Sequence, residues 1–154
     1  MTTVGLLCTI GYQSFSQPDW LSTLLDHDVE AVIDVRDVPL SRKPGFSKSQ
    51  LMRCLDAVGI EYIHVRALGN PRAYREALRD GLDFDIFSDM FASLLDERDE
   101  ILQQVLDRLA HQRICLLCSE EDPGACHRSL VAERLRSMRP RQVQVVHLRN
   151  EHAA

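Results

Sequence analysis

Apolar residues along the chain alternate between short continuous runs and longer segments with helical spacing. Runs that are apolar at nearly every position are typical of parallel strands buried on both faces of a sheet. Such runs predict strands at Val4–Ile10, Val29–Val35, Ile60–Val65, Arg113–Cys118 and Gln142–Leu148. The sequence therefore predicts a mainly parallel, five-stranded sheet.

The segments between these runs repeat apolar residues every three or four positions, which predicts helices. We expect a helix over Pro18–His27, a second from the capping pair Ser47 and Gln50 to Gly59, mostly helical structure over residues 71–112, and a last helix over His127–Met138. The charged stretch Glu97–Glu100 is either a bend or a solvated turn of one long helix. This alternation predicts one α/β domain over residues 1–154, a three-layer sandwich with a Rossmann-like sheet and helices on both faces.

Composition narrows the class of protein. The 154 residues are 45% hydrophobic and 27% charged, and the net charge is -5. The acidic balance disfavours nucleic acid or an anionic membrane as a partner, and no segment approaches the roughly 20 apolar residues that span a bilayer. The first residues lack the pattern of a secretory leader.

The chain contains an odd number of cysteines, five, and Cys8, Cys54 and Cys115 lie in apolar patterns. We therefore expect free thiols and a cytoplasmic location.

Unusual residues gather directly after the predicted strands. The carboxyl ends of parallel strands meet at one rim of a sheet, which is where α/β folds bind ligands. The segments expected there are Gly11-Tyr12, residues 34–42, residues 66–70 and residues 118–128.

The segment from Cys118 to Arg128 carries the strongest chemical signal. Cys118 ends a strand, and Cys126 opens a helix beside His127 and Arg128. A thiol at a helix N-terminus beside cationic groups is favoured as the reactive thiolate, and the same helix end can bind an anion. Two alternatives stay open: the cysteines only pack, or Cys118, Cys126 and His127 bind zinc, with His64 as a further ligand. The spacing does not match common zinc patterns, so we expect no metal and no cofactor.

Two other strand-end segments could contact a ligand. Asp34 ends an apolar strand, where a carboxylate needs a partner, and Arg36 is the nearest cation on the same face. The pair is either a structural ion pair, or Arg36 points with Ser41 and Arg42 toward an anionic ligand. In the first strand-end segment, Gly11 would allow close approach of a ligand to the backbone, and Tyr12 would cover the ligand or pack.

Taken together, these segments resemble the family of domains of unknown function numbered 488. The motifs that carry the resemblance are Thr9-Ile10-Gly11-Tyr12, Asp34-Val35-Arg36 with Pro39 and Ser41-Arg42, Gly45-Phe46, Gly59-Ile60 with Tyr62 and His64, Leu68-Gly69, and Leu117 to Glu120 with Cys126-His127-Arg128. The resemblance extends over residues 6–135. It implies the fold and the site, and it implies no established reaction.

Two hypotheses of function follow. The first is an enzyme that acts on a phosphate-bearing or nucleotide-like small molecule. In that enzyme the arginines would bind the anion, Cys118 or Cys126 would be the nucleophile, and Glu120 or His127 would move protons. The second is a non-catalytic module that binds an anion, a nucleotide or a nucleic acid, with cysteines that only pack. A zinc-stabilised domain is a minor third alternative. The sequence predicts no oligomeric state.

Overall fold

The computed structural model of the chain describes residues 4–151, and within them it contains a five-stranded, all-parallel sheet. The strand order is β3-β2-β4-β1-β5, with β1 (Gly5–Gly11), β2 (Ala31–Asp34), β3 (Glu61–His64), β4 (Ile114–Cys118) and β5 (Val143–His147). Each strand coincides with a predicted apolar run to within two residues at either end. The predicted sheet is confirmed, and every pairing is parallel.

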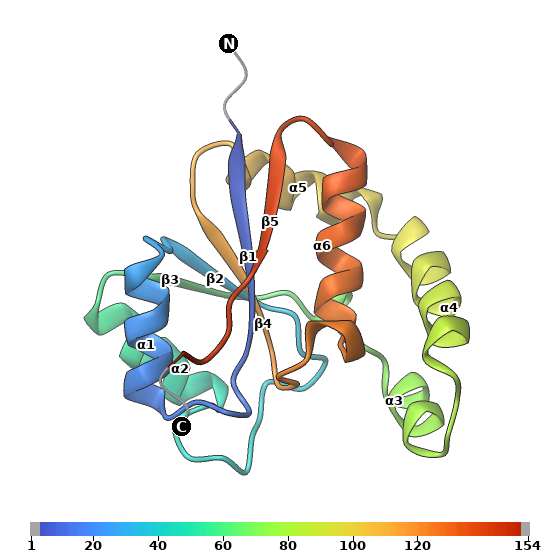
Figure 1. Cartoon of the computed structure of the whole chain (residues 1–154), viewed down its shortest axis with the longest axis horizontal. Coiled ribbons are helices and arrows are strands. Elements are labelled where there is room, and N and C mark those ends of the chain that lie inside the picture. The colour runs from blue at the N-terminus through green and yellow to red at the C-terminus, as the bar shows by residue number, and fades with distance from the viewer. Residues whose placement is uncertain (1–3, 152–154) are drawn as a thin grey trace.

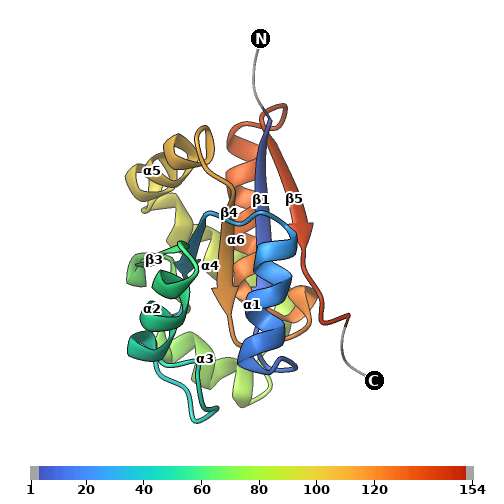
Figure 2. The same ribbon diagram turned by 90° about the vertical axis from the view of Figure 1, so that its left-hand side faces the viewer.

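Helices cover both faces of this sheet (Figures 1 and 2). They are α1 (Gln17–Asp26), α2 (Lys48–Ala57), α3 (Arg72–Arg79), α4 (Phe84–Asp96), α5 (Asp99–Leu109) and α6 (His127–Met138), with short 3-10 turns η1 (Arg66–Leu68) and η2 (Pro123–Ala125). The first two helices pack on one face, and α4, α5 and α6 pack on the other. The fold is therefore the predicted α/β sandwich of Rossmann-like character.

Local signals explain where several helices begin and end. The Gln50 side chain accepts from the Ser47 N–H at 3.2 Å, as the capping pair predicts, and Gly59 follows α2 with a φ of +77°. The predicted helical stretch over residues 71–112 is divided into three helices. The charged stretch is a bend, because α4 ends at Asp96 and α5 begins at Asp99.

Alternation along β4 decides which side chains reach the rim on each face. Cys115 and Leu117 point into the apolar cluster beneath α1 and α2, whereas Ile114 and Leu116 belong to the cluster beneath α4 to α6. Because side chains in a strand alternate, Cys118 lies on the α6 face at the carboxyl end of β4. Gly11 is its partner in register on β1.

Within residues 4–151, no helix is both long enough and apolar enough to cross a bilayer.

Candidate functional site

A cavity of about 260 Å³ lies at the carboxyl ends of β1, β2 and β4. It is lined by Tyr12, Arg36, Asp37, Val38, Leu40, Asn70, Arg75, Cys118, Ser119, Glu120 and His127. Three of the predicted strand-end segments therefore line this cavity, and Asn70 of the fourth joins them. This arrangement follows from a parallel sheet, whose carboxyl ends all face one rim.

The two cysteines of the 118–128 segment meet around one carboxylate. Cys118 Sγ donates to Glu120 Oε2 at 3.0 Å, and Cys126 Sγ donates to the same oxygen at 3.3 Å. Ser119 Oγ is a third donor to it, at 3.2 Å. Cys118 borders the cavity and Cys126 does not, although both side chains are buried. Of the two thiols, Cys118 is thus the one beside the open space.

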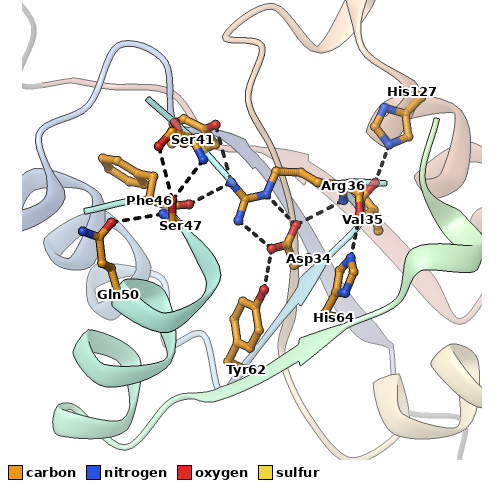
Figure 3. A network of polar contacts seen from close by, with 11 residues as sticks. Asp34, Val35, Arg36, Ser41, Phe46, Ser47, Gln50, Tyr62, His64 and His127 are labelled. Carbon is orange, nitrogen blue, oxygen red and sulfur yellow. Dashed lines mark hydrogen bonds and ion pairs between the residues drawn. The ribbon is translucent and has the colours of Figure 1, made fainter. Parts of the chain in front are cut away.

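His127 is fixed so that one ring nitrogen faces both thiols. Its Nε2 lies 2.6 Å from the Val35 carbonyl oxygen, and a carbonyl only accepts, so Nε2 carries a hydrogen (Figure 3). Nδ1 lies 3.7 Å from Cys118 Sγ and 3.9 Å from Cys126 Sγ. The ring also packs edge-on against Phe91 of α4, with centroids 5.5 Å apart. The imidazole therefore presents Nδ1 to the thiols in a defined orientation.

Burial and hydrogen bonds shift the ionisation of this cluster. Burial raises the pKa of Cys126 well above its ordinary value. Burial acts in the same direction on Glu120, but the thiol hydrogen bonds from Cys118 and Cys126 outweigh it, and the pKa of this carboxyl is lowered. For His127, burial would lower the pKa, and the interactions with Cys126, the Val35 carbonyl and Glu120 outweigh it, so its pKa is raised. The cluster thus holds an ionised carboxylate beside a Cys126 thiol that keeps its proton.

Gly11 and Arg128 hold the loop that carries Glu120. A Cβ on Gly11 would lie 1.7 Å from the Glu120 carbonyl oxygen, so only glycine allows the loop to cross β1 here. Arg128 is fully buried, and its guanidinium donates to the carbonyls of Glu120 and Glu121. The structure places both residues against the loop and outside the cavity lining, whereas the sequence predicted contact with a ligand.

Asp34 and Arg36 form a buried network at the end of β2 (Figure 3). Arg36 Nε and Nη2 donate to the two carboxylate oxygens of Asp34 at 2.9 and 2.7 Å, and Nη1 donates to the Phe46 carbonyl at 2.7 Å. Tyr62 Oη donates to Asp34 at 2.6 Å, and His64 Nε2 bonds the Arg36 carbonyl at 2.7 Å. Asp34 is fully buried, while Arg36 reaches the cavity wall with most of its donors already used.

Three further residues were predicted to contact a ligand, and only one of them lines the cavity. Tyr12 lines the cavity and stacks on Phe46, with ring centroids 4.6 Å apart. The Ser41 hydroxyl accepts from the Lys43 N–H at 3.1 Å, which makes it part of the loop's own structure. Arg42 is exposed, and neither Ser41 nor Arg42 is among the residues that line the cavity. Of these three, only Tyr12 lies beside Cys118 and His127.

Sequence reasoning missed the cavity's most accessible cation. Arg75 of α3 lines the cavity with a side chain 36% exposed, and it donates to Asp37 at 3.1 Å and to the Asn70 carbonyl at 3.2 Å. Asn70 is buried, and its Oδ1 has no hydrogen-bond partner among residues 4–151. The available signal was the Asn70-Pro71 pair after β3, which begins α3 at the rim.

One group of side chains in the site has the composition of a metal centre. The donor atoms of Cys118, Cys126 and His127 all lie within 4.8 Å of one another. His64, the fourth ligand considered from sequence, does not belong to this group and bonds the Arg36 carbonyl instead.

Comparison with known proteins identifies a family for most of the chain. The family model described as "Domain of unknown function DUF488" matches residues 19–135 of the 154. No curated protein and no solved structure matches the chain.

Proposed function

The chain belongs to the DUF488 family, and from the geometry of its site we propose that it is a cysteine-dependent hydrolase or transferase that acts on a phosphate-bearing or nucleotide-like small molecule. The observation that carries the proposal is the position of Cys118. Its sulfur borders the cavity and lies 3.7 Å from the Nδ1 of a histidine whose Nε2 is held by the Val35 carbonyl. A nucleophile, a base and a group that orients the base are the three parts of an activated thiol site.

The proton path follows from the hydrogen-bond directions. In the resting site Cys118 donates its proton to Glu120, an ionised carboxylate that is a weak base at neutral pH. His127 Nδ1 is the stronger base within reach, so it takes the thiol proton when the sulfur attacks. The sulfur then forms a bond to the electrophilic phosphorus or carbon, and the leaving group departs with the proton from His127. Water, or a second substrate, breaks the bond to sulfur and regenerates the thiol.

The helix that follows Cys126 supports the same chemistry. Cys126 is the N-cap of α6 and His127 its first residue, so the positive end of the helix dipole lies at the cluster. This field stabilises a thiolate at Cys118 and a negative charge that develops on a substrate. The raised pKa of Cys126 and its position outside the cavity lining favour Cys118 over Cys126 as nucleophile.

Arg75 is the group best placed to bind the anionic part of the substrate, because its guanidinium is half-buried at the cavity wall. Asn70 lines the cavity as well, but its unpartnered Oδ1 is a hydrogen-bond acceptor and does not bind an anion. Arg36 contributes positive charge to the wall, but its hydrogen bonds to Asp34 and Phe46 leave it few free donors. Val38 and Leu40 supply an apolar side that fits the less polar part of such a molecule.

The test is covalent capture on the metal-free protein. Small acyl- and phosphoryl-transfer reagents, including activated phosphate esters of nucleosides, are incubated with the wild type and with Cys118→Ser. We expect an adduct on Cys118 and turnover in the wild type, both lost in Cys118→Ser and retained in Cys54→Ser, whose site lies on α2 away from the cavity. An adduct that forms equally on other cysteines, or turnover that survives Cys118→Ser, would refute the proposal.

A further inference from the structure

The cluster around Cys118 also brings together three donor atoms, two sulfurs and one imidazole nitrogen, that suit a soft divalent metal ion. From its geometry we propose that Cys118, Cys126, His127 and Glu120 bind one zinc-class ion, and that the bound ion masks the Cys118 sulfur. The first part stands on the donor atoms alone. The second part, the masking, rests on the proposed function.

The spacing of the donor atoms matches tetrahedral coordination. Zinc bonds of about 2.3 Å to sulfur and about 2.0 Å to nitrogen, at tetrahedral angles, place a sulfur and a nitrogen roughly 3.6 Å apart and two sulfurs roughly 3.8 Å apart. The structure has 3.7 and 3.9 Å between His127 Nδ1 and the two sulfurs, and all three donor atoms lie within 4.8 Å of one another. The ligands therefore need only small rotations to surround an ion.

Glu120 is not one of these three mutually close donors, but its carboxylate contacts both sulfurs, and a shift toward His127 would make it the fourth ligand. Its Oε2 lies 3.0 Å from Cys118 Sγ and 3.3 Å from Cys126 Sγ, and it currently accepts both thiol hydrogens. When an ion binds, the two thiols release their protons, and the ion replaces those protons between sulfur and carboxylate. Two thiolates, one carboxylate and a neutral imidazole then surround a divalent charge, a set typical of zinc.

The surroundings of the ligands are those of a prepared site. His127 Nε2 bonds the Val35 carbonyl, which fixes the ring with Nδ1 toward the sulfurs, and Ser119 Oγ bonds the Glu120 carboxylate at 3.2 Å. Such outer contacts orient first ligands and strengthen metal binding. Cys118, Cys126 and His127 are between 2% and 6% exposed, so water competes poorly for the ion.

Cobalt(II) titration of chelator-treated protein tests the site without any substrate. We expect one equivalent of cobalt to give intense sulfur-to-cobalt absorption and the visible bands of a tetrahedral ion, and one equivalent of zinc to abolish both. Cys126→Ser should lose most of the sulfur-to-cobalt absorption, and Glu120→Gln should weaken cobalt binding about tenfold. Cys54→Ser is the matched control and should bind cobalt as the wild type does.

Absence of sulfur-to-cobalt absorption in the wild type, or its persistence in the Cys118→Ser/Cys126→Ser double variant, would overturn the proposal. Circular dichroism of each metal-free variant checks folding. If Cys126→Ser does not fold, Glu120→Gln and His127→Gln decide, because either change must weaken metal binding without removing a sulfur.

Alkylation of the cysteines separates this proposal from the proposed function. If cobalt binds but metal-free Cys118 is no more reactive than Cys115, the metal site stands and the thiol enzyme fails. If Cys118 is reactive and no metal binds, the reverse holds.

Discussion

The molecule contains two pairs of neighbouring buried thiols, and they differ in almost everything except burial. Cys8 and Cys115 are partners in register on β1 and β4, and both are fully buried in the apolar cluster beneath α1 and α2. Cys118 and Cys126 are 4% and 2% exposed, yet they share a carboxylate, face an imidazole, and one of them borders a cavity. Cys115 and Cys118 even belong to the same strand, on opposite faces.

Burial alone therefore does not decide what a thiol does. Burial raises the pKa of Cys8 to about 11, against a small opposing effect of Arg113, so its sulfur stays protonated at neutral pH. Burial likewise raises the pKa of Cys115 well above its ordinary value. Around Cys118 the same depth of burial is accompanied by an acceptor for the proton and a helix N-terminus. The polar partners make the difference, and they come from the strand-end loops.

The largest effect on stability near Cys118 and Cys126 should come from removing the Asp34 carboxylate. Asp34→Ala leaves the Arg36 guanidinium buried without its counter-charge and removes the acceptor of Tyr62, so we expect a loss of about 3–5 kcal/mol in the free energy of unfolding. Chemical denaturation measures it. Glu133→Ala, which breaks the exposed pair with Arg136, is the control and should cost about 0–1 kcal/mol. Equal costs for the two variants would show that the network does not support the site.

A smaller effect should follow from crowding the Glu120 loop. Gly11→Ala forces a Cβ into the Glu120 carbonyl, so we expect a loss of about 1–3 kcal/mol and displacement of the carboxylate from the two thiols. Gly124→Ala, in the same loop region, meets only a flexible Asp122 side chain at 3.3 Å and should stay within about 0.5 kcal/mol of the wild type. Protection of Cys8 and Cys115 from labelling should be unchanged in both. Loss of that protection in folded Gly11→Ala would erase the contrast between the pairs.

The smallest effect on stability should come from Arg75→Ala, because the pair with Asp37 is partly exposed and worth about 0–1 kcal/mol. Its effect on ligand binding should be clear: inorganic phosphate at constant ionic strength raises the melting temperature of the wild type and not of Arg75→Ala. Arg72→Ala on the same helix, exposed and paired with Glu76, should keep the wild-type response. If phosphate still raises the melting temperature of Arg75→Ala, the anion does not bind in this part of the cavity.

Sequence patterns predicted the sheet, the layers and the segments at the rim, because apolar runs and parallel strands leave few other arrangements. They also predicted one site for Cys118, Glu120, Cys126 and His127, and these side chains lie together in the structure, while their catalytic roles stay a prediction. They could not assign Arg128, since adjacent residues on a helix point about 100° apart, and only one of His127 and Arg128 can face the cavity. In the structure it is His127.

Two further side chains show the limit of pattern reasoning. Gly11 suggested a close approach, and the structure has one, but the approaching group is the protein's own Glu120 carbonyl. For Arg75 the only signal was indirect, the Asn70-Pro71 pair that begins α3 at the rim, because tertiary packing decides which residues of α3 face the cavity.

The most direct test of Cys118 as an activated thiol is the rate at which each cysteine of the folded, metal-free protein reacts with iodoacetamide at neutral pH, resolved by peptide mass spectrometry. A thiol whose pKa is raised from 9.0 to about 11 is ionised roughly a hundredfold less than an ordinary one, so Cys8 should label very slowly. We expect Cys118 to label at least about a hundredfold faster than Cys8 and Cys115, and His127→Ala to remove most of this advantage. Labelling of Cys118 at the rate of Cys115, or an unchanged rate in His127→Ala, would contradict the activation of Cys118 by His127.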